Sequence, residues 1–115
     1  MISDSCRVLI AGGGTAGHVI PAVAIAKALY RRGVLTEENE VHFVCSKRGV
    51  GREIVNDAGF EATVLPGRGI QRKVTFRNAI STLSLFVAFV RASLMIFRAK
   101  PEIIVVMGGY ASLAC

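Results

Sequence analysis

Apolar and polar residues along this chain fall into alternating blocks that predict strands and helices in turn. Short apolar runs are typical of buried strands, and longer runs with apolar residues at every third or fourth position are typical of helices. The predicted strands span residues 8–11, 40–45, 61–65 and 103–107, and the predicted helices span residues 22–32, 51–58 and 76–99, with a polar connection over residues 34–40. Strict alternation of the two element types favours an α/β fold.

Glycines and prolines mark the expected ends of these elements. Gly33 and Gly59 each follow a predicted helix and are expected to cap its C-terminus. Pro21 fits the first turn of the first helix, where a missing N–H has no consequence. Pro66 stops the third strand, and Pro101 ends the long third helix.

The alternating order also constrains the topology. Right-handed crossovers between successive strands require a parallel sheet with helices on both faces. The chain has 115 residues, enough for one such domain. The expected strand order is 3-2-1-4, as in Rossmann-like folds, with the switch point between the first and fourth strands. Ligands of such sheets bind at that point, outside the carboxyl ends of the strands.

A glycine-rich turn at residues 12–17 follows the first strand and opens the first helix. Gly12, Gly14 and Gly17 satisfy the G-x-G-x-x-G spacing of nucleotide-binding turns. Glycine permits close approach of a ligand, and the first N–H groups of a helix have no partner within the helix. The turn predicts a phosphate site, with Gly13 and Gly14 in the phosphate loop. A tight turn without a ligand is the alternative interpretation.

Two histidines are interpreted differently. His18 lies at the mouth of the glycine-rich turn, where a neutral imidazole can accept a proton from an alcohol or donate an N–H to a pyrophosphate. Helix capping is its alternative role. His42 alternates within a strand and is expected to face solvent or a helix edge, without a role. A second glycine turn, at residues 108–112, follows the fourth strand and is expected to converge on the first turn.

The charge and the cysteines narrow the possible partners. A net charge of +6 and a pI near 9.8 favour a nucleotide, a nucleic acid or an anionic membrane. The sequence lacks an aromatic platform, helix-turn-helix spacing and a zinc pattern, so no nucleic acid partner is expected.

No Asp-x-Asp pattern or cysteine spacing indicates a metal site. Cys6, Cys45 and Cys115 are expected to be reduced thiols, with Cys45 in the core. No signal peptide is expected before the first strand.

The end of the second strand keeps a nicotinamide-binding alternative open. An NAD site usually places an acidic residue there for the ribose hydroxyls. Residues 45–48 read Cys-Ser-Lys-Arg instead. Ser46 and Arg48 could hold the 2′-phosphate of NADP, so an NADP-binding oxidoreductase domain is an alternative function. Solvated surface charge is the simpler interpretation of Lys47 and Arg48.

The predicted long helix carries two apolar stripes. The first, expected to face the sheet, comprises Leu83, Phe86, Val87, Val90, Leu94 and Phe97. The second comprises Leu85, Phe89, Ala92 and Ile96. This second stripe could pack on a neighbouring loop or subunit, or it could rest in a membrane interface beside the basic residues Arg72 and Lys73. The apolar run is expected to be too short and too broken to span a bilayer.

Three segments together carry a resemblance to a known family. They are residues 13–22 (Gly-Gly-Thr-Ala-Gly-His-Val-Ile-Pro-Ala), residues 67–72 (Gly-Arg-Gly-Ile-Gln-Arg) and residues 107–112 (Met-Gly-Gly-Tyr-Ala-Ser). They resemble the first glycine loop, the basic loop and the later glycine loop of the MurG family of peptidoglycan N-acetylglucosaminyltransferases. The similarity covers essentially the whole chain, in order. Ala16 and Ala111 depart mildly, because glycine and valine are usual there, and alanine at position 16 demands ordinary backbone angles.

The resemblance implies the N-terminal lobe of a GT-B glycosyltransferase. The implied reaction is an inverting transfer of N-acetylglucosamine from UDP-N-acetylglucosamine to the 4-hydroxyl of undecaprenyl-pyrophosphoryl-N-acetylmuramoyl pentapeptide, without a tightly bound cofactor. By this resemblance Thr15, Ala16 and Gly17 touch the donor, and His18 is the base or a pyrophosphate contact. The acceptor-side positions are Gly108, Gly109, Tyr110 and Ser112, and the membrane contacts are Arg72, Lys73, Leu85 and Phe89.

The resemblance also sets expectations for location and domain organisation. The protein is expected at the cytoplasmic face of the bacterial cell membrane, bound peripherally, with the lipid-linked acceptor and the anionic membrane surface as partners. Residues 1–115 are expected to form part of the acceptor-side lobe, without the family's C-terminal donor lobe. The chain alone is therefore expected to have little or no transferase activity. A membrane-recruiting, non-catalytic half of a split glycosyltransferase is a further alternative.

Overall fold

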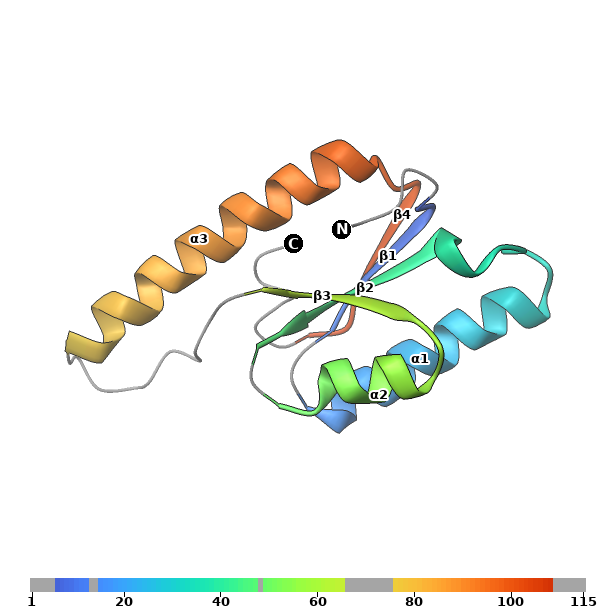
Figure 1. Cartoon of the computed structure of the whole chain (residues 1–115), viewed down its shortest axis with the longest axis horizontal. Coiled ribbons are helices and arrows are strands. Elements are labelled where there is room, and N and C mark those ends of the chain that lie inside the picture. Colours follow the sequence, from blue (N-terminus) through green and yellow to red (C-terminus); the bar gives the residue numbers. More distant parts are fainter. Residues whose placement is uncertain (1–5, 13–14, 48, 66–75, 109–115) are drawn as a thin grey trace.

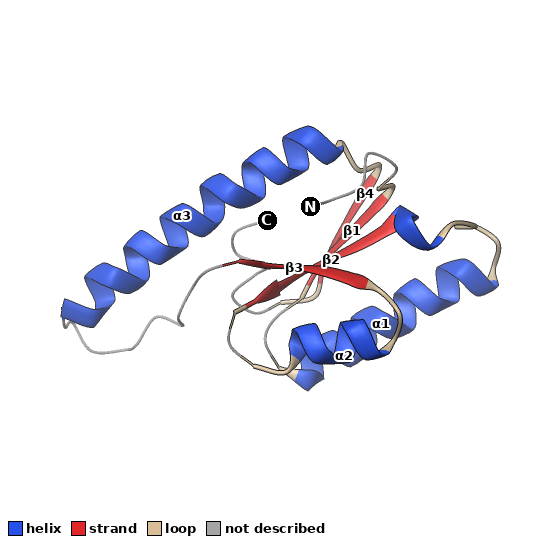
Figure 2. Ribbon diagram, in the orientation of Figure 1, coloured by secondary structure: helices blue, strands red, loops and turns tan. Residues whose placement is uncertain are grey.

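The computed structural model describes residues 6–12, 15–47, 49–65 and 76–108, with the backbone alone described at residues 38 and 76–81. Strands and helices alternate as the sequence predicts (Figure 2). The elements are β1 (Val8–Ala11), α1 (Ala16–Arg31), the 3-10 helix Glu38–Glu40, β2 (Val41–Ser46), α2 (Gly51–Asp57), β3 (Glu61–Leu65), α3 (Phe76–Ala99) and β4 (Ile103–Val106).

The four strands form one parallel sheet in the order β3-β2-β1-β4. Val8 of β1 pairs with Val41 of β2 on one side and with Ile103 of β4 on the other. Helices α1 and α2 cover one face of the sheet, and α3 lies across the other (Figure 1). The predicted Rossmann-like topology, with helices on both faces, is therefore confirmed.

The start of α1 differs from the prediction. The helix begins at Ala16 rather than at residue 22, so Pro21 lies in the second turn and not in the first. Thr15, in an extended conformation, is the N-cap. The buried face of α1 starts at Val19, one helical turn before Val23. The apolar residues of the helix therefore begin before Pro21, which the prediction used as the boundary of the helix. Gly33 and Gly59 end α1 and α2 with φ of 72° and 87°, as expected of C-terminal glycines.

The core consists of two apolar layers, one on each face of the sheet. Under α1 and α2, large side chains such as Ile10 and Phe43 pack against the buried face of α1. On the opposite face the small side chains of Ala88 and Ala92 bring α3 down onto the sheet, where Leu9 and Val44 are buried. The two layers differ in how much of each helix they bury, since α3 contributes mainly alanines.

The prediction for the orientation of α3 was wrong. The stripe expected to face the sheet is exposed instead, with exposed fractions of 64% for Phe86 and 75% for Phe97. The sheet contacts come from Ala88, Ala92 and the half-buried Ile96. The prediction had placed Ala92 and Ile96 on the second stripe and Ala88 on neither. A helical wheel shows two apolar stripes, but only the shape of the sheet determines which one fits. Alanines permit a close approach that a row of phenylalanines would prevent.

The expectation that His42 faces solvent was wrong, whereas the alternative, packing at a helix edge, stays a prediction. Its side chain is 4% exposed, and its Nε2 lies 2.7 Å from Oγ1 of Thr63 on β3. β2 is an inner strand with helices over both faces, so neither side of it meets solvent. Burial is the main cause that lowers the pKa of His42, because the charged imidazolium is poorly solvated there.

The cysteine prediction is confirmed for the two described thiols. Cys6 and Cys45 are free and buried, and Cys45 belongs to the core under α1 and α2. Burial raises the pKa of Cys45 to about 11. A thiol with such a pKa is almost entirely protonated near neutral pH and serves as a small apolar side chain. Cys115 lies outside the described residues.

Candidate functional site at the carboxyl ends of the strands

The N-terminus of α1 lies directly after β1. The N–H of Gly12 donates to the carbonyl of Val44 at 3.0 Å, which continues the β1–β2 ladder to the start of the turn. Thr15 is the N-cap of α1, yet its side chain makes no capping hydrogen bond to the backbone. Among the described residues, no acceptor is found for the N–H groups of Ala16 and Gly17. With no acidic residue in the first turn, the helix presents these donors and the positive end of its dipole to an anion.

The imidazole of His18 is held by the residue that caps the helix. Thr15 Oγ1 lies 2.7 Å from Nδ1 of His18. If the hydroxyl donates, Nδ1 is the acceptor and Nε2 carries the proton, which suits a contact to a pyrophosphate. If Nδ1–H donates to the hydroxyl, Nε2 has a free lone pair and can act as a base. Both tautomers satisfy the observed contact.

The ring of His18 packs against Gly108, at the end of β4. A Cβ added to Gly108 would lie 3.3 Å from Cδ2 and 3.4 Å from Nε2 of His18. Gly108 also has φ of +92°, which an L side chain rarely adopts. The N–H of Met107 donates to the carbonyl of Ala11 at 2.9 Å, so β4 stays paired with β1 up to this contact. The start of α1 and the end of β4 therefore meet at the switch point through His18 and Gly108.

The structure brings together five of the predicted site residues, which are Thr15, Ala16, Gly17, His18 and Gly108. Ala16 takes ordinary helical angles, as expected of an alanine at that position. Seven other predicted positions lie outside the described residues: Gly13, Gly14, Arg72, Lys73, Gly109, Tyr110 and Ser112. No group of three His, Cys, Asp or Glu side chains in the described ranges could hold a metal ion.

The predicted membrane contacts on α3 fall on different sides of that helix. Leu85 is half-buried, whereas Phe89 is 55% exposed. Among residues 82–99 of α3, the exposed large apolar side chains are Leu83, Phe86, Val87, Phe89, Val90, Leu94 and Phe97, called the outer face of α3 below. The 18-residue stretch Thr82–Ala99, with a mean hydropathy of 1.6, is long and apolar enough to cross a membrane. The prediction that this helix is too short and too broken to span a bilayer is therefore wrong by length and composition. Two residues of the stretch, Ala88 and Ala92, nevertheless pack on the sheet.

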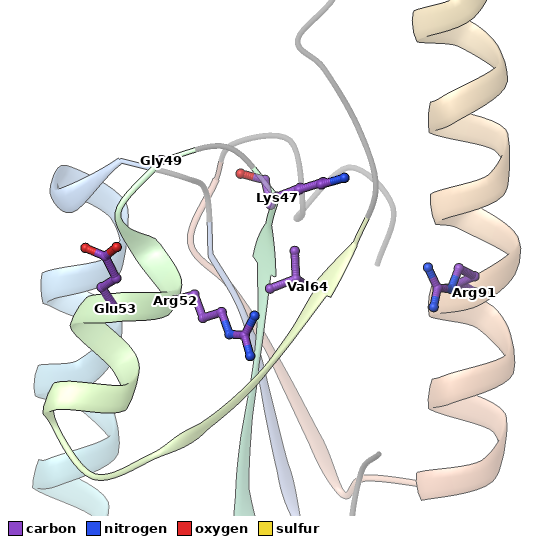
Figure 3. A pocket seen from close by; sticks show the side chains of 7 residues that line it. Lys47, Gly49, Arg52, Glu53, Val64 and Arg91 are labelled. Carbon is purple, nitrogen blue, oxygen red and sulfur yellow. The ribbon is translucent and has the colours of Figure 1, made fainter.

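A second feature of the same sheet edge lies at the ends of β2 and β3. Seven residues line a cavity of about 450 Å³ there: Ser46, Lys47, Gly49, Arg52, Glu53, Val64 and Arg91 (Figure 3). Sequence reasoning singled out Ser46 and Lys47 but missed Arg52 and Arg91. These two come from α2 and α3, so only the topology could have placed them beside the end of β2. Ser46 is 7% exposed, and Arg48, its proposed partner for NADP, lies outside the described residues.

Comparison with known proteins decides the family. Residues 8–115 match the glycosyltransferase family 28 N-terminal domain. The chain belongs to this family. The match covers all four strands and the two glycine turns, and it confirms the N-terminal domain of a GT-B fold. The resemblance to the MurG family is confirmed as well, and no finding supports the NADP-binding alternative.

Several curated relatives share one name, "UDP-N-acetylglucosamine--N-acetylmuramyl-(pentapeptide) pyrophosphoryl-undecaprenol N-acetylglucosamine transferase". The protein of Syntrophus aciditrophicus is 40% identical over 92% of this chain. Those of Ruminiclostridium cellulolyticum and Clostridioides difficile are each 36% identical, over 90% and 92% of the chain. The chain spans 28%, 28% and 25% of these three relatives.

Proposed function

We propose that this chain is the acceptor-side part of a peptidoglycan N-acetylglucosaminyltransferase. The transfer runs from UDP-N-acetylglucosamine to the 4-hydroxyl of the undecaprenyl-pyrophosphoryl-N-acetylmuramoyl pentapeptide. The observation that carries the proposal is 40% identity, across 92% of the chain, to a relative with that named activity. The contact between His18 and Gly108 at the switch point supports it, because it joins the two glycine turns that the family resemblance assigned to the substrates.

In this mechanism the acceptor hydroxyl oxygen attacks the anomeric carbon, and the bond from that carbon to the diphosphate oxygen breaks. The bonding electrons leave with UDP, and the configuration inverts. The N–H groups of Ala16 and Gly17 and the dipole of α1 stabilise the negative charge that develops on the diphosphate. His18 Nε2 either takes the hydroxyl proton or donates its own N–H to the diphosphate. Thr15 fixes the ring for either role through the 2.7 Å contact.

A chimeric enzyme tests this proposal. Residues 1–115 replace the matching segment of the Syntrophus aciditrophicus transferase, and turnover is measured with UDP-N-acetylglucosamine and a lipid-linked acceptor. We expect the chimera to be active and the chain alone to show little or no turnover. His18→Ala in the chimera should reduce kcat about a hundredfold or more. Ile20→Ala, an exposed position on the same helix, is the matched control and should leave kcat unchanged.

A second substitution separates the two roles of His18. Glutamine keeps an N–H donor but cannot accept a proton at neutral pH. If His18→Gln restores most of the turnover lost in His18→Ala, the ring acts as a donor to the diphosphate. If His18→Gln is as poor as His18→Ala, the base role is favoured. Full activity of the His18→Ala chimera would contradict both roles, and an inactive but folded parent chimera would contradict the acceptor-side assignment.

The outer face of α3 supports a peripheral position at the cytoplasmic face of the membrane. Phe86 and Phe89 are exposed, and the chain has a net charge of +6. An apolar helix face on a basic protein binds anionic lipid surfaces. Vesicles of phosphatidylglycerol and phosphatidylcholine should therefore sediment the chain, less so at high salt. Phe89→Asp should weaken binding, whereas Val34→Asp, at an exposed site away from α3, should not.

Absence of vesicle binding, or equal binding by the two variants, would exclude this membrane contact. Binding to vesicles together with an inactive, folded chimera would favour the non-catalytic, membrane-recruiting alternative.

A further inference from the structure

The cavity at the ends of β2 and β3 gathers cationic side chains from three separate elements. Lys47 follows β2, Arg52 belongs to α2, and Arg91 belongs to α3. They are called the cationic pocket below. β3 is the outermost described strand on this side of the sheet. The pocket lies at the carboxyl end of this edge strand, and its lining includes residues of α2 on one face of the sheet and of α3 on the other. Val64 of β3 lies between the three charges (Figure 3).

The three positive charges have no described ion-pair partner. No ion pair or hydrogen bond joins the side chain of Lys47, Arg52 or Arg91 to another residue in the part of the chain that the structure describes. In Figure 3 the ammonium of Lys47 points toward α3, and the guanidinium of Arg91 points back toward the strands. Glu53 also lines the cavity, but its carboxylate points away from the other labelled charges. Like charges that share a cavity repel, and a bound anion relieves that repulsion.

We propose that the cationic pocket binds a phosphate group of a phosphorylated ligand. Each guanidinium offers a planar pair of N–H donors that matches phosphate oxygens, and the lysine adds a point charge. A carboxylate carries one negative charge and would neutralise the cluster poorly, whereas a phosphate monoester or a diphosphate carries about two or more. A volume of about 450 Å³ is within the usual range of small-molecule sites.

This site is distinct from the turn at the start of α1. The turn offers backbone N–H groups beside β1 and β4, whereas the cationic pocket offers side chains beside β2 and β3. The charge and placement of these side chains favour a phosphate ligand whether or not the protein has the proposed transferase activity. The phosphate could belong to a soluble compound or to the headgroup of a membrane lipid, and the experiment separates these sources.

The test is a titration of the 115-residue chain with inorganic pyrophosphate at constant ionic strength, followed by ¹H–¹⁵N NMR and calorimetry. We expect saturable binding with shifts in the resonances of Arg52, Val64 and the Arg91 side chain. The double substitution Arg52→Gln/Arg91→Gln should weaken binding about tenfold or more, since two charged hydrogen-bond donors are lost. Arg98→Gln removes an exposed charge from the same helix outside the cavity and should change the affinity less than about twofold.

A parallel arm uses vesicles of phosphatidylcholine with or without phosphatidic acid. Binding to phosphatidic acid that the double variant loses, with weak binding of free pyrophosphate, assigns the pocket to a lipid headgroup. The reverse pattern assigns it to a soluble ligand.

Lack of saturable binding in both arms would overturn the proposal. Shifts confined to residues 15–18, or an equal loss in Arg98→Gln, would overturn it as well. Because the shifts are read on the unsubstituted chain, a double variant that fails to fold does not prevent this decision. The transferase proposal is judged by the turnover of the chimera, so the two proposals can fail separately.

Discussion

Charged groups are paired with each other at the amino-terminal edge of the sheet and have no described ion-pair partner at the carboxyl edge. At the amino-terminal edge, the guanidinium of Arg7 donates to carboxylate oxygens of both Glu40 and Glu102 at 3.2 Å. Glu40 in turn accepts the N–H groups of Thr36 and Glu37. At the carboxyl edge, the N–H groups at the start of α1 and the cations of the pocket have no described partner. This difference suggests that polar groups at one edge hold the fold together, whereas those at the other are available for ligands.

The same contrast applies to the helices. α1 and α2 cover large core side chains such as Phe43. α3 contacts the sheet through alanines, while Phe86, Phe89 and Phe97 are exposed. We expect an exposed apolar surface of this kind to contact a membrane or another partner. The outer face of α3 and the carboxyl edge of the sheet make few contacts within the described fold, and they are the two regions that we propose contact a membrane and ligands.

After the substitution of His18 itself, the largest expected effect comes from Gly108, where the comparison of the edges is sharpest. Gly108→Ala places a Cβ 3.3–3.4 Å from the ring of His18 and imposes φ of +92° on an alanine. We expect turnover of the chimera to fall about tenfold or more, because the ring is displaced from its working position.

Gly59→Ala is the matched control for that experiment. Its φ is +87°, so the backbone strain is similar at roughly 1–2 kcal/mol. No atom lies within 4 Å of its added Cβ, so only stability should suffer. Equal turnover in the two variants would mean that the contact between residue 108 and His18 does not affect turnover.

A smaller effect, on stability alone, is expected at the amino-terminal edge. Arg7→Met removes the contacts that join β1 to Glu40 and to Glu102 before β4, so Tm should decrease. The affinity of the cationic pocket for pyrophosphate should stay unchanged. Arg98→Met removes an arginine without described ion pairs and should leave Tm close to that of the parent chain. If Arg7→Met weakened anion binding as strongly as a substitution in the pocket, the two edges would not be independent.

Sequence patterns predicted the order of the elements, the strand order and the bounds of β1, β3 and α3, because each depends on local apolar periods and on right-handed crossovers. They failed where packing decides. Pro21 predicted a helix start near residue 22, but the helix begins at Ala16 and already buries Val19. The alternation in the strand predicted solvent or a helix edge for His42, but an inner strand covered by helices on both faces has no solvent side. In the site, the turn and His18 were predictable from glycine spacing, whereas Arg52 and Arg91 join the pocket only through the tertiary fold.

The smallest expected effect is the change in the free energy of unfolding as the pH decreases. Burial lowers the pKa of His42, so at pH values just below about 6.5 the unfolded chain binds a proton that the folded chain does not. Stability should therefore fall as pH decreases from about 6.5 toward the lowered pKa. Hydrogen bonds from the backbone N–H groups of Glu37 and Thr36 lower the pKa of Glu40, so its contribution is lost at more acid pH, below about 4.3.

His42→Gln separates these two ranges. Glutamine can keep a hydrogen bond to Thr63 but does not titrate, so urea unfolding at several pH values should show the upper decline removed and the lower one kept. If the variant kept the full decline between neutral pH and about 5, His42 would not be its source. The upper range would then have to be assigned to another group, while the lower range would still report the pairing of Glu40 at the amino-terminal edge.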